Sequence, residues 1–178
     1  MQTQVHPLEP YFRQAVRSSY ETKLGLFDPE VTAYVARVLC EFIEPDSLYK
    51  LRDSSGNPIQ DLDEMLKASD PVHGTARGFD EERAVRRQIG NYALFVAGMY
   101  PEAIDADRQP RRLHLGDLIR AGKESYYIVS QFNLFEYEEE APMFARLSEN
   151  FERCVLGLTL AREEMGPNRP TMPTIPGQ

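Results

Sequence analysis

An almost wholly apolar stretch, residues 89–102 (IGNYALFVAGMYPE), constrains the fold more than any other part of the chain. A helix that is apolar on every side must be surrounded by other elements, so this stretch predicts the central helix of a bundle. Asp80, followed by Glu81 and Glu82, is expected to cap its N-terminus and to place acids at the positive end of the helix dipole. Pro101 is expected to end it, because the residue before a proline disfavours helical geometry.

Two glycines, Gly90 and Gly98, lie inside this predicted helix on nearly the same face. A glycine in a helix interior costs roughly 1 kcal/mol relative to alanine. Close approach of a neighbouring helix or of a bound ligand would offset that cost. No polar groups converge on this face in the sequence pattern, which favours close packing.

The run GNYALFVAGMYPE, the later run GKESYY and an amphipathic helix beginning near APMFARLSENFE resemble a family of uncharacterised all-helical bacterial proteins. The segment that carries the resemblance is G-x-Y-x-L-F-x-x-G-x-x-P-E, and the similarity covers residues 11–165. The resemblance implies an all-α fold. The family has no established activity, so it implies no cofactor and no catalytic residue.

The chain has 178 residues and a formal net charge of −8, spread evenly over its two halves. A domain of this length buries a core without disulfides or metal. The even negative charge argues against binding to nucleic acid or to an anionic membrane. No secretory signal and no membrane-spanning apolar run is recognised, so a cytoplasmic location is expected. Cys40 and Cys154 lie in apolar helical patterns and are predicted to be buried free thiols, with a disulfide as the alternative.

Two basic trios stand out against the acidic background. They are Arg83, Arg86 and Arg87, and Arg108, Arg111 and Arg112. The first trio is expected on a solvated helix face, paired with Glu81 and Glu82, and the second in a loop. Binding of an anion is the alternative for either trio.

The rest of the chain reads almost entirely as helix. Further helices are predicted over residues 8–23, from Pro29 to before Pro45, over 60–69, from Asp117 to residue 132, and from Pro142 to Met165. Asp28 before Pro29 is a strong start signal. Gly122 could break its helix in two, and residues 126–129 would also suit a strand. Residues 46–59 favour a short helix or irregular structure over a small hairpin.

The last predicted helix carries the clearest apolar seam. Its members are Phe144, Leu147, Phe151, Cys154, Leu158, Ala161 and Met165. Such a helix belongs to a core or to an interface between subunits. Beyond it, residues 166–178 form a proline-rich tail that is expected to be flexible, with docking as the alternative. The sequence therefore predicts a single-domain all-α bundle of five to seven helices over residues 1–165.

The motifs of common enzyme classes are missing. None of the three histidines has a glutamate three residues before it or an aspartate after it, so di-iron and His-Asp metal sites are not expected. Nucleotide-binding glycine loops and a nucleophile elbow are also missing. The acidic run 136–140 is expected to complement a helix dipole rather than to bind a cation. His73 and His114 could act as general bases, but loop-packing roles are favoured. No catalytic residue, metal or cofactor is predicted.

Four polar side chains form the best candidate ligand site, between the central helix and the next one: Tyr92, Glu102, Tyr126 and Tyr127; Tyr100, Asn91 and Glu124 belong to the same polar set. Glu102 or Glu124 could supply partners for buried tyrosine hydroxyls, and a structural hydrogen-bond network is favoured over an active site. Two functions follow. The first is a non-catalytic module that binds a protein partner or itself through apolar surface left on the C-terminal helix. The second is a small-molecule binder or enzyme with a tyrosine and glutamate pocket. A concave cavity lined by these side chains would favour the second, and a flat apolar patch near residues 144–165 the first.

Overall fold

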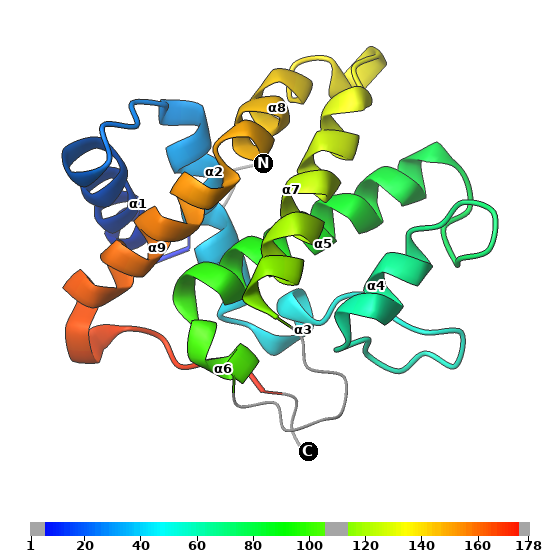
Figure 1. The fold of residues 1–178 in the computed structure, drawn as a ribbon, viewed down its shortest axis with the longest axis horizontal. Coiled ribbons are helices and arrows are strands. Elements are labelled where there is room, and N and C mark those ends of the chain that lie inside the picture. Colours follow the sequence, from blue (N-terminus) through cyan, green and yellow to red (C-terminus); the bar gives the residue numbers. More distant parts are fainter. Residues whose placement is uncertain (1–5, 106–113, 175–178) are drawn as a thin grey trace.

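The computed structural model describes residues 6–105 and 114–174, which form an all-α bundle (Figure 1). The described elements are α1 (Glu9–Arg17), η1 (Ser18–Lys23), α2 (Pro29–Phe42), α3 (Pro45–Leu48), α4 (Leu62–Ala68), α5 (Phe79–Met99), α6 (Pro101–Asp105), α7 (Leu115–Gln131), η2 (Phe135–Tyr137), α8 (Ala141–Glu149), α9 (Phe151–Met165) and η3 (Gly166–Asn168). No strand forms in these ranges; a single bridge joins Arg52 to Pro58 after the short helix α3. The predicted single-domain helical bundle is confirmed, with one-turn helices α3 and α6 in addition to the expected ones.

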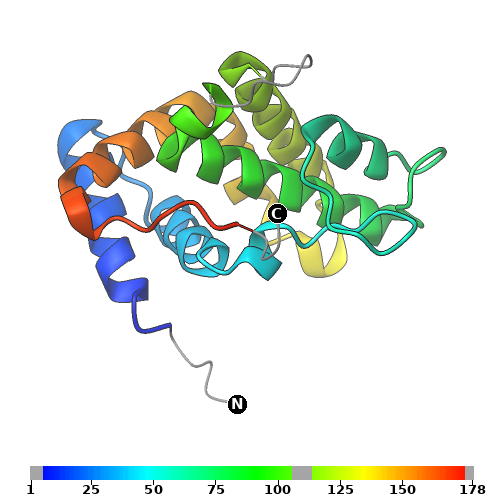
Figure 2. The same cartoon turned by 90° about the horizontal axis from the view of Figure 1, so that it is seen from below.

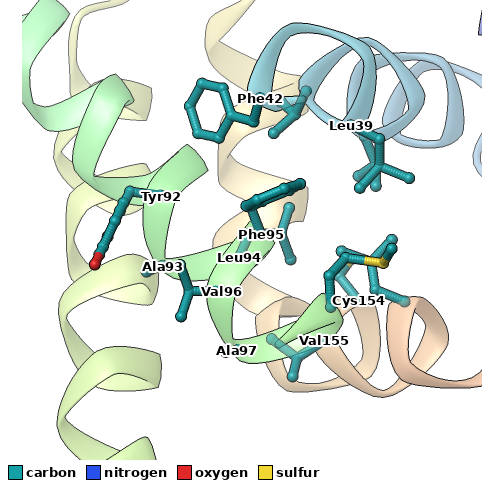
Figure 3. Close-up of a cluster of buried hydrophobic side chains, with 14 of the residues drawn as sticks. Leu39, Phe42, Tyr92, Ala93, Leu94, Phe95, Val96, Ala97, Cys154 and Val155 are labelled. Carbon is teal, nitrogen blue, oxygen red and sulfur yellow. The ribbon is translucent and has the colours of Figure 1, made fainter. Parts of the chain in front are cut away.

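Helix α5 is the central member of the bundle, as predicted. Residues 88–100 are all buried, and α7 and α9 pack along it (Figure 1). On another side, Phe95 meets Phe42 of α2 with ring centroids 5.5 Å apart, and Cys154 of α9 lies in the same apolar cluster (Figure 3). An all-round apolar helix is thus covered on several faces at once.

The glycines of the bundle are points of close helix approach. A Cβ added at Gly90 would lie 2.4 Å from Tyr126 Cε1, and one at Gly98 would lie 2.6 Å from Leu158 Cβ. This confirms close packing at both positions. Helix α7 continues through Gly122 without a break. The ring of Phe151 occupies the space that a side chain at this position would take.

The start of α2 follows the prediction, whereas the start of α5 differs from it. Asp28 caps α2 by accepting a hydrogen bond from the Val31 amide at 3.2 Å. Helix α5 is instead entered through Gly78, whose φ of 93° is a left-handed conformation that suits glycine. Asp80 therefore lies inside the first turn, where its carboxylate accepts a hydrogen bond from the Tyr137 hydroxyl.

The single helix predicted from Pro142 to Met165 is wrong, because two helices, α8 and α9, meet at Asn150. The backbone leaves helical geometry there (φ −104°, ψ 19°), and the Asn150 amide donates to the Arg146 carbonyl at the end of α8. The predicted seam is nevertheless buried along its whole length. The break redirects the chain without exposing its apolar side.

The expected flexible tail is docked over the part that the structure describes. Tyr100 donates to the Pro170 carbonyl at 2.6 Å, and Tyr49 donates to the Pro173 carbonyl at 3.3 Å. Met172 packs against the core between these two bonds. Figure 2 shows this segment running back across the molecule from the end of α9 toward α3.

Both cysteines are buried free thiols, as predicted. No helix of the described residues is long and apolar enough to cross a membrane.

Candidate functional site

The four predicted site residues occupy different places in the fold. Tyr126 is fully buried, and its hydroxyl donates to Asn91 Oδ1 at 2.8 Å. Tyr127, the next residue of α7, is exposed. Glu102 forms an ion pair with Arg162 through two contacts of 2.8 Å. The fourth residue, Tyr92, lines a cavity that the other three do not line.

That cavity, here called the Tyr92 cleft, lies between α5 and α7 and has a volume of about 620 Å³. Its polar side chains are Tyr49, Gln60, Asp61, Asp63, Tyr92, Asp117, Arg120, Glu124 and Thr174, and its apolar wall includes Leu66, Val96, Ile104 and Met172. Glu124 is the second residue of the predicted polar set that lies here. The Tyr92 cleft thus adjoins the central helix and the next one, but α4, α6 and the tail supply many of its walls.

Tyr92 is the most enclosed polar residue of the Tyr92 cleft. Its side chain points away from the apolar cluster around Phe42 and toward α7 (Figure 3), and only 7% of the residue is exposed. No hydrogen bond joins its hydroxyl to another described residue. Burial raises the pKa of this hydroxyl, and the neighbouring Tyr49 and Asp61 add to the rise. The hydroxyl is thus protonated at neutral pH and open to a ligand.

Carboxylates outnumber cations on the walls of the Tyr92 cleft. Four acidic residues line it against one basic residue, Arg120, which pairs with Asp117. Asp61 caps α4 by accepting from the Glu64 amide at 3.1 Å. Asp63 and Glu124 form no ion pair with a described residue. The two unpaired carboxylates give the cleft a negative potential.

Two tyrosine rings form an aromatic part of the Tyr92 cleft. The centroids of Tyr49 and Tyr92 are 6.5 Å apart, with their planes at 55°. Tyr49 follows α3, and the bond from its hydroxyl to Pro173 joins it to the tail. Aromatic faces beside carboxylates are the environment in which proteins hold organic cations.

Residues outside the predicted set complete the Tyr92 cleft. The sequence placed Asp61 only in a short amphipathic helix, and it favoured a flexible tail over a docked one. The start signal of α4, an aspartate before Leu62, could be read from the sequence. Its position opposite α7 depends on tertiary packing, which no local pattern encodes.

Arg83 corrects the prediction of a solvated basic face. It is only 5% exposed; its guanidinium lies 4.0 Å from the centre of the Tyr137 ring and bonds to Glu140 at 2.8 Å. One member of the acidic run 136–140 is therefore the partner of a buried arginine. Arg86 contacts Ser125 at 3.5 Å, and the second basic trio lies outside the described residues.

The structure gives the histidines no place in the Tyr92 cleft. His73 and His114 are exposed and do not line it. Within the described ranges, no group of three or more histidine, cysteine, aspartate or glutamate side chains is arranged to hold a metal ion.

The segment around η2 has more exposed apolar side chains than the C-terminal helix. On α9 the largest exposed apolar residue is Leu156, at 50%. Around η2, Leu134 and Phe135 are far more exposed, and Phe79 of α5 stacks near Phe132 with centroids 6.5 Å apart. These four residues are here called the η2 patch.

Comparison with known proteins gives no relative from which a function could be transferred. No family model matches the chain, and no curated protein or solved structure is significantly similar to it. The resemblance to an all-helical bacterial family therefore stays a prediction, and function has to be argued from the geometry of the chain.

Proposed function

We propose that this protein is a binding module that holds a compact organic cation in the Tyr92 cleft. The observation that carries the proposal is Tyr92, a residue only 7% exposed, whose hydroxyl has no hydrogen-bond partner among the described residues and opens to a cavity rich in carboxylates. An alkylammonium ion fits this environment, since it can donate to the hydroxyl and approach Asp63 or Glu124.

The size and composition of the Tyr92 cleft support a small ligand. Its volume of about 620 Å³ falls within the range of about 300–1,000 Å³ typical of ligand sites. The rings of Tyr49 and Tyr92 offer faces for a cation, an interaction of about 0.5–2 kcal/mol. The walls formed by Val96 and Ile104 suit a short alkyl chain. A primary amine with a few methylene groups combines these features.

Isothermal titration with 1,4-diaminobutane, n-butylamine and 1-butanol tests this proposal. We expect both amines to bind and the neutral alcohol not to bind. Tyr92→Phe should weaken amine binding roughly fivefold, because a hydrogen bond contributes about 1 kcal/mol. Glu124→Gln should weaken it by a similar factor and reduce its dependence on salt. Tyr127→Phe is the matched control and should leave binding unchanged.

Two results would overturn the proposal. One is equal binding of 1-butanol and the amines, which would show that charge is not recognised. The other is the absence of saturable amine binding to the folded wild-type protein at millimolar concentrations.

A second candidate function, docking to a protein partner, is supported by Phe135. This residue is 88% exposed and has a φ of 54°, a conformation that non-glycine residues rarely adopt. The turn is tethered by the bond from Tyr137 to Asp80 and by Arg83 on the Tyr137 ring. A tethered, exposed aromatic side chain is the kind of anchor found at protein interfaces.

The acids beside the η2 patch indicate the chemistry of such a partner. Glu136, Glu138 and Glu139 are exposed, so the complementary surface would be an apolar hollow ringed by basic side chains. Chemical-shift mapping with an amphipathic Leu/Lys peptide tests this candidate. Shifts centred on residues 132–139 and lost in Phe135→Ser would support it. Shifts confined to other surfaces would contradict it. Native mass spectrometry separates self-association from both candidates and detects a co-purified small molecule.

A further inference from the structure

A second cavity, here called the Asn91 cavity, lies between α2, α3 and α5 and has a volume of about 250 Å³. Its polar side chains are Tyr34, Arg37, Glu41, Ser47, Lys50, Arg87, Gln88, Asn91 and Glu140. Val38, Phe42, Leu51 and Val85 supply apolar wall. It shares no residue with the Tyr92 cleft, although Asn91 and Tyr92 are neighbours on α5.

Asn91 provides an unused donor in this cavity. The residue is 6% exposed, and its Oδ1 accepts hydrogen bonds from the hydroxyls of Tyr34 at 2.7 Å and Tyr126 at 2.8 Å. Its amide nitrogen forms no hydrogen bond with a described residue. This nitrogen is not one of the fully buried side-chain atoms that lack a partner in the described ranges, so it is open to the cavity. An acceptor bound in the cavity would take a hydrogen bond from it, which contributes about 0.5–1.5 kcal/mol net.

Three cationic side chains surround the same cavity. Arg37, Lys50 and Arg87 all line it, and none forms an ion pair with a described residue. Arg37 and Lys50 are exposed, whereas Arg87 is half-buried.

Two of these cations, Arg87 and Arg37, act on Tyr34, one of the two tyrosines whose hydroxyls bond to Asn91. Burial raises the pKa of Tyr34, and the positive charge of nearby Arg87 opposes that rise. Arg37 approaches the same ring, with its Cζ 5.7 Å from the ring centroid. Both guanidinium groups therefore lie close to the tyrosine that is bonded to Asn91.

The Asn91 cavity is lined by two carboxylates, fewer than its three cations. Glu140 is bonded to Arg83, a residue that does not line the cavity. Glu41 is exposed and is the remaining acid on the wall. The side-chain amide of Gln88 is already occupied, since it donates to the carbonyls of Ser47 and Leu48. The available donors are thus those of Asn91, Arg37, Lys50 and Arg87, together with the Ser47 hydroxyl.

We propose that the Asn91 cavity binds a compact anion through a carboxylate or phosphate group, with the Asn91 amide and the Arg87 guanidinium as its main contacts. Guanidinium groups match the planar oxygen pairs of carboxylates and phosphates. The small volume limits the ligand to a simple organic acid or a small phosphate ester. The ligand has the opposite charge to the one assigned to the Tyr92 cleft, so the two proposals stand or fall separately.

Isothermal titration of the full chain with sodium phosphate and with sodium succinate, at ionic strength matched with sodium chloride, tests this site. We expect saturable binding of one anion per chain. Tighter binding of phosphate would identify a phosphate ester as the ligand type, and tighter binding of succinate an organic acid.

Variants then locate the bound anion. Arg87→Gln should weaken binding about tenfold or more, since a hydrogen bond to a charged group contributes about 1.5–3 kcal/mol. Asn91→Asp keeps the oxygen that accepts from the two tyrosines but replaces the amide by a repelling carboxylate, so binding should be lost. Arg17→Gln removes the same charge from an exposed site and should leave binding unchanged.

Three outcomes would overturn the proposal. They are no saturable binding of either anion to the wild-type chain, equal binding by wild type and Arg87→Gln, or an equal loss in Arg17→Gln. Circular dichroism shows whether each variant is folded. If Asn91→Asp does not fold, Arg87→Gln still tests the site.

Discussion

The ring of Tyr126 lies against α5 at Gly90, so closely that a Cβ at this glycine would be 2.4 Å from Tyr126 Cε1. Gly90→Ala should therefore force the buried ring to move. Tyr126 is also packed against Phe144 and Phe151, with centroids 5.6 and 5.7 Å away, so it has little room to do so. We expect a loss of about 1–3 kcal/mol in the free energy of unfolding, measured by urea titration.

Gly116→Ala is the matched control for this prediction. Gly116 is exposed near the start of α7, and nothing lies within 4 Å of an added Cβ. Alanine is the better helix former, so this variant should be unchanged or more stable by up to about 1 kcal/mol. Equal destabilisation of both variants would contradict close packing as the reason for Gly90.

The two hydroxyls that bond to Asn91 should be energetically coupled. Tyr126→Phe and Tyr34→Phe each remove one donor to the same oxygen, and each should cost about 1 kcal/mol. The double variant should cost more than the sum, because Asn91 Oδ1 then has no remaining donor from either tyrosine. A double-mutant cycle by urea unfolding measures this coupling. Strictly additive losses would show that the bonds act independently.

The central helix could be predicted from the sequence because its signal is local. Burial of residues 88–100 follows from a continuous apolar run, and the tight contacts at Gly90 and Gly98 follow from the cost of glycine in a helix. The break at Asn150 could not be seen in the same way. The seam continues through it with unchanged spacing, so periodicity alone predicts one helix.

The Tyr92 cleft was predictable only in its location. Tyr92 and Glu124 belong to adjacent helices of the expected pair, and both line it. Tyr126 and Tyr92 are both tyrosines in apolar helices, so the sequence does not distinguish them. Tyr126 is buried and bonded to Asn91, because tertiary packing decides which side of a helix faces a neighbour. Arg83 was missed for a similar reason: its ring and carboxylate partners come from a segment more than fifty residues away.

Removal of the docked tail should destabilise the protein. A chain that ends at Asn168 lacks the acceptors of Tyr100 and Tyr49 and the packing of Met172. We expect a loss of about 1–3 kcal/mol, from two hydrogen bonds and one partly buried side chain. Thermal unfolding followed by circular dichroism measures it.

Tyr100→Phe in the full chain separates docking from other effects of truncation. It removes only the bond to Pro170 and should cost about 1 kcal/mol. The same substitution in the chain ending at Asn168 should cost less, because the acceptor is already gone. An unchanged stability after truncation would contradict a structural role for the tail.

The contact between Asp28 and Arg146 should make stability depend on pH. Asp28 is partly buried, which opposes ionisation. Hydrogen bonds from Arg146 (2.6 Å) and the Val31 amide outweigh this effect and hold the pKa of the carboxyl below its ordinary value of 3.8. Its stabilising contribution is therefore complete above the unfolded pKa and is lost as the pH falls through the lower folded pKa.

Asp28→Asn isolates this contribution, because asparagine caps a helix as well as aspartate does but carries no charge. At pH 7 the variant should be less stable by about 0.5–1 kcal/mol, the range of a partly exposed ion pair. The difference should shrink as the pH falls below the unfolded pKa and through the lower folded pKa of the wild-type carboxyl. Urea unfolding at pH 7, 5 and 3 measures the trend. A difference near zero at every pH would mean that Asp28 acts through its cap alone, since the neutral asparagine keeps the cap. A constant non-zero difference would mean that ionisation of Asp28 is not its cause.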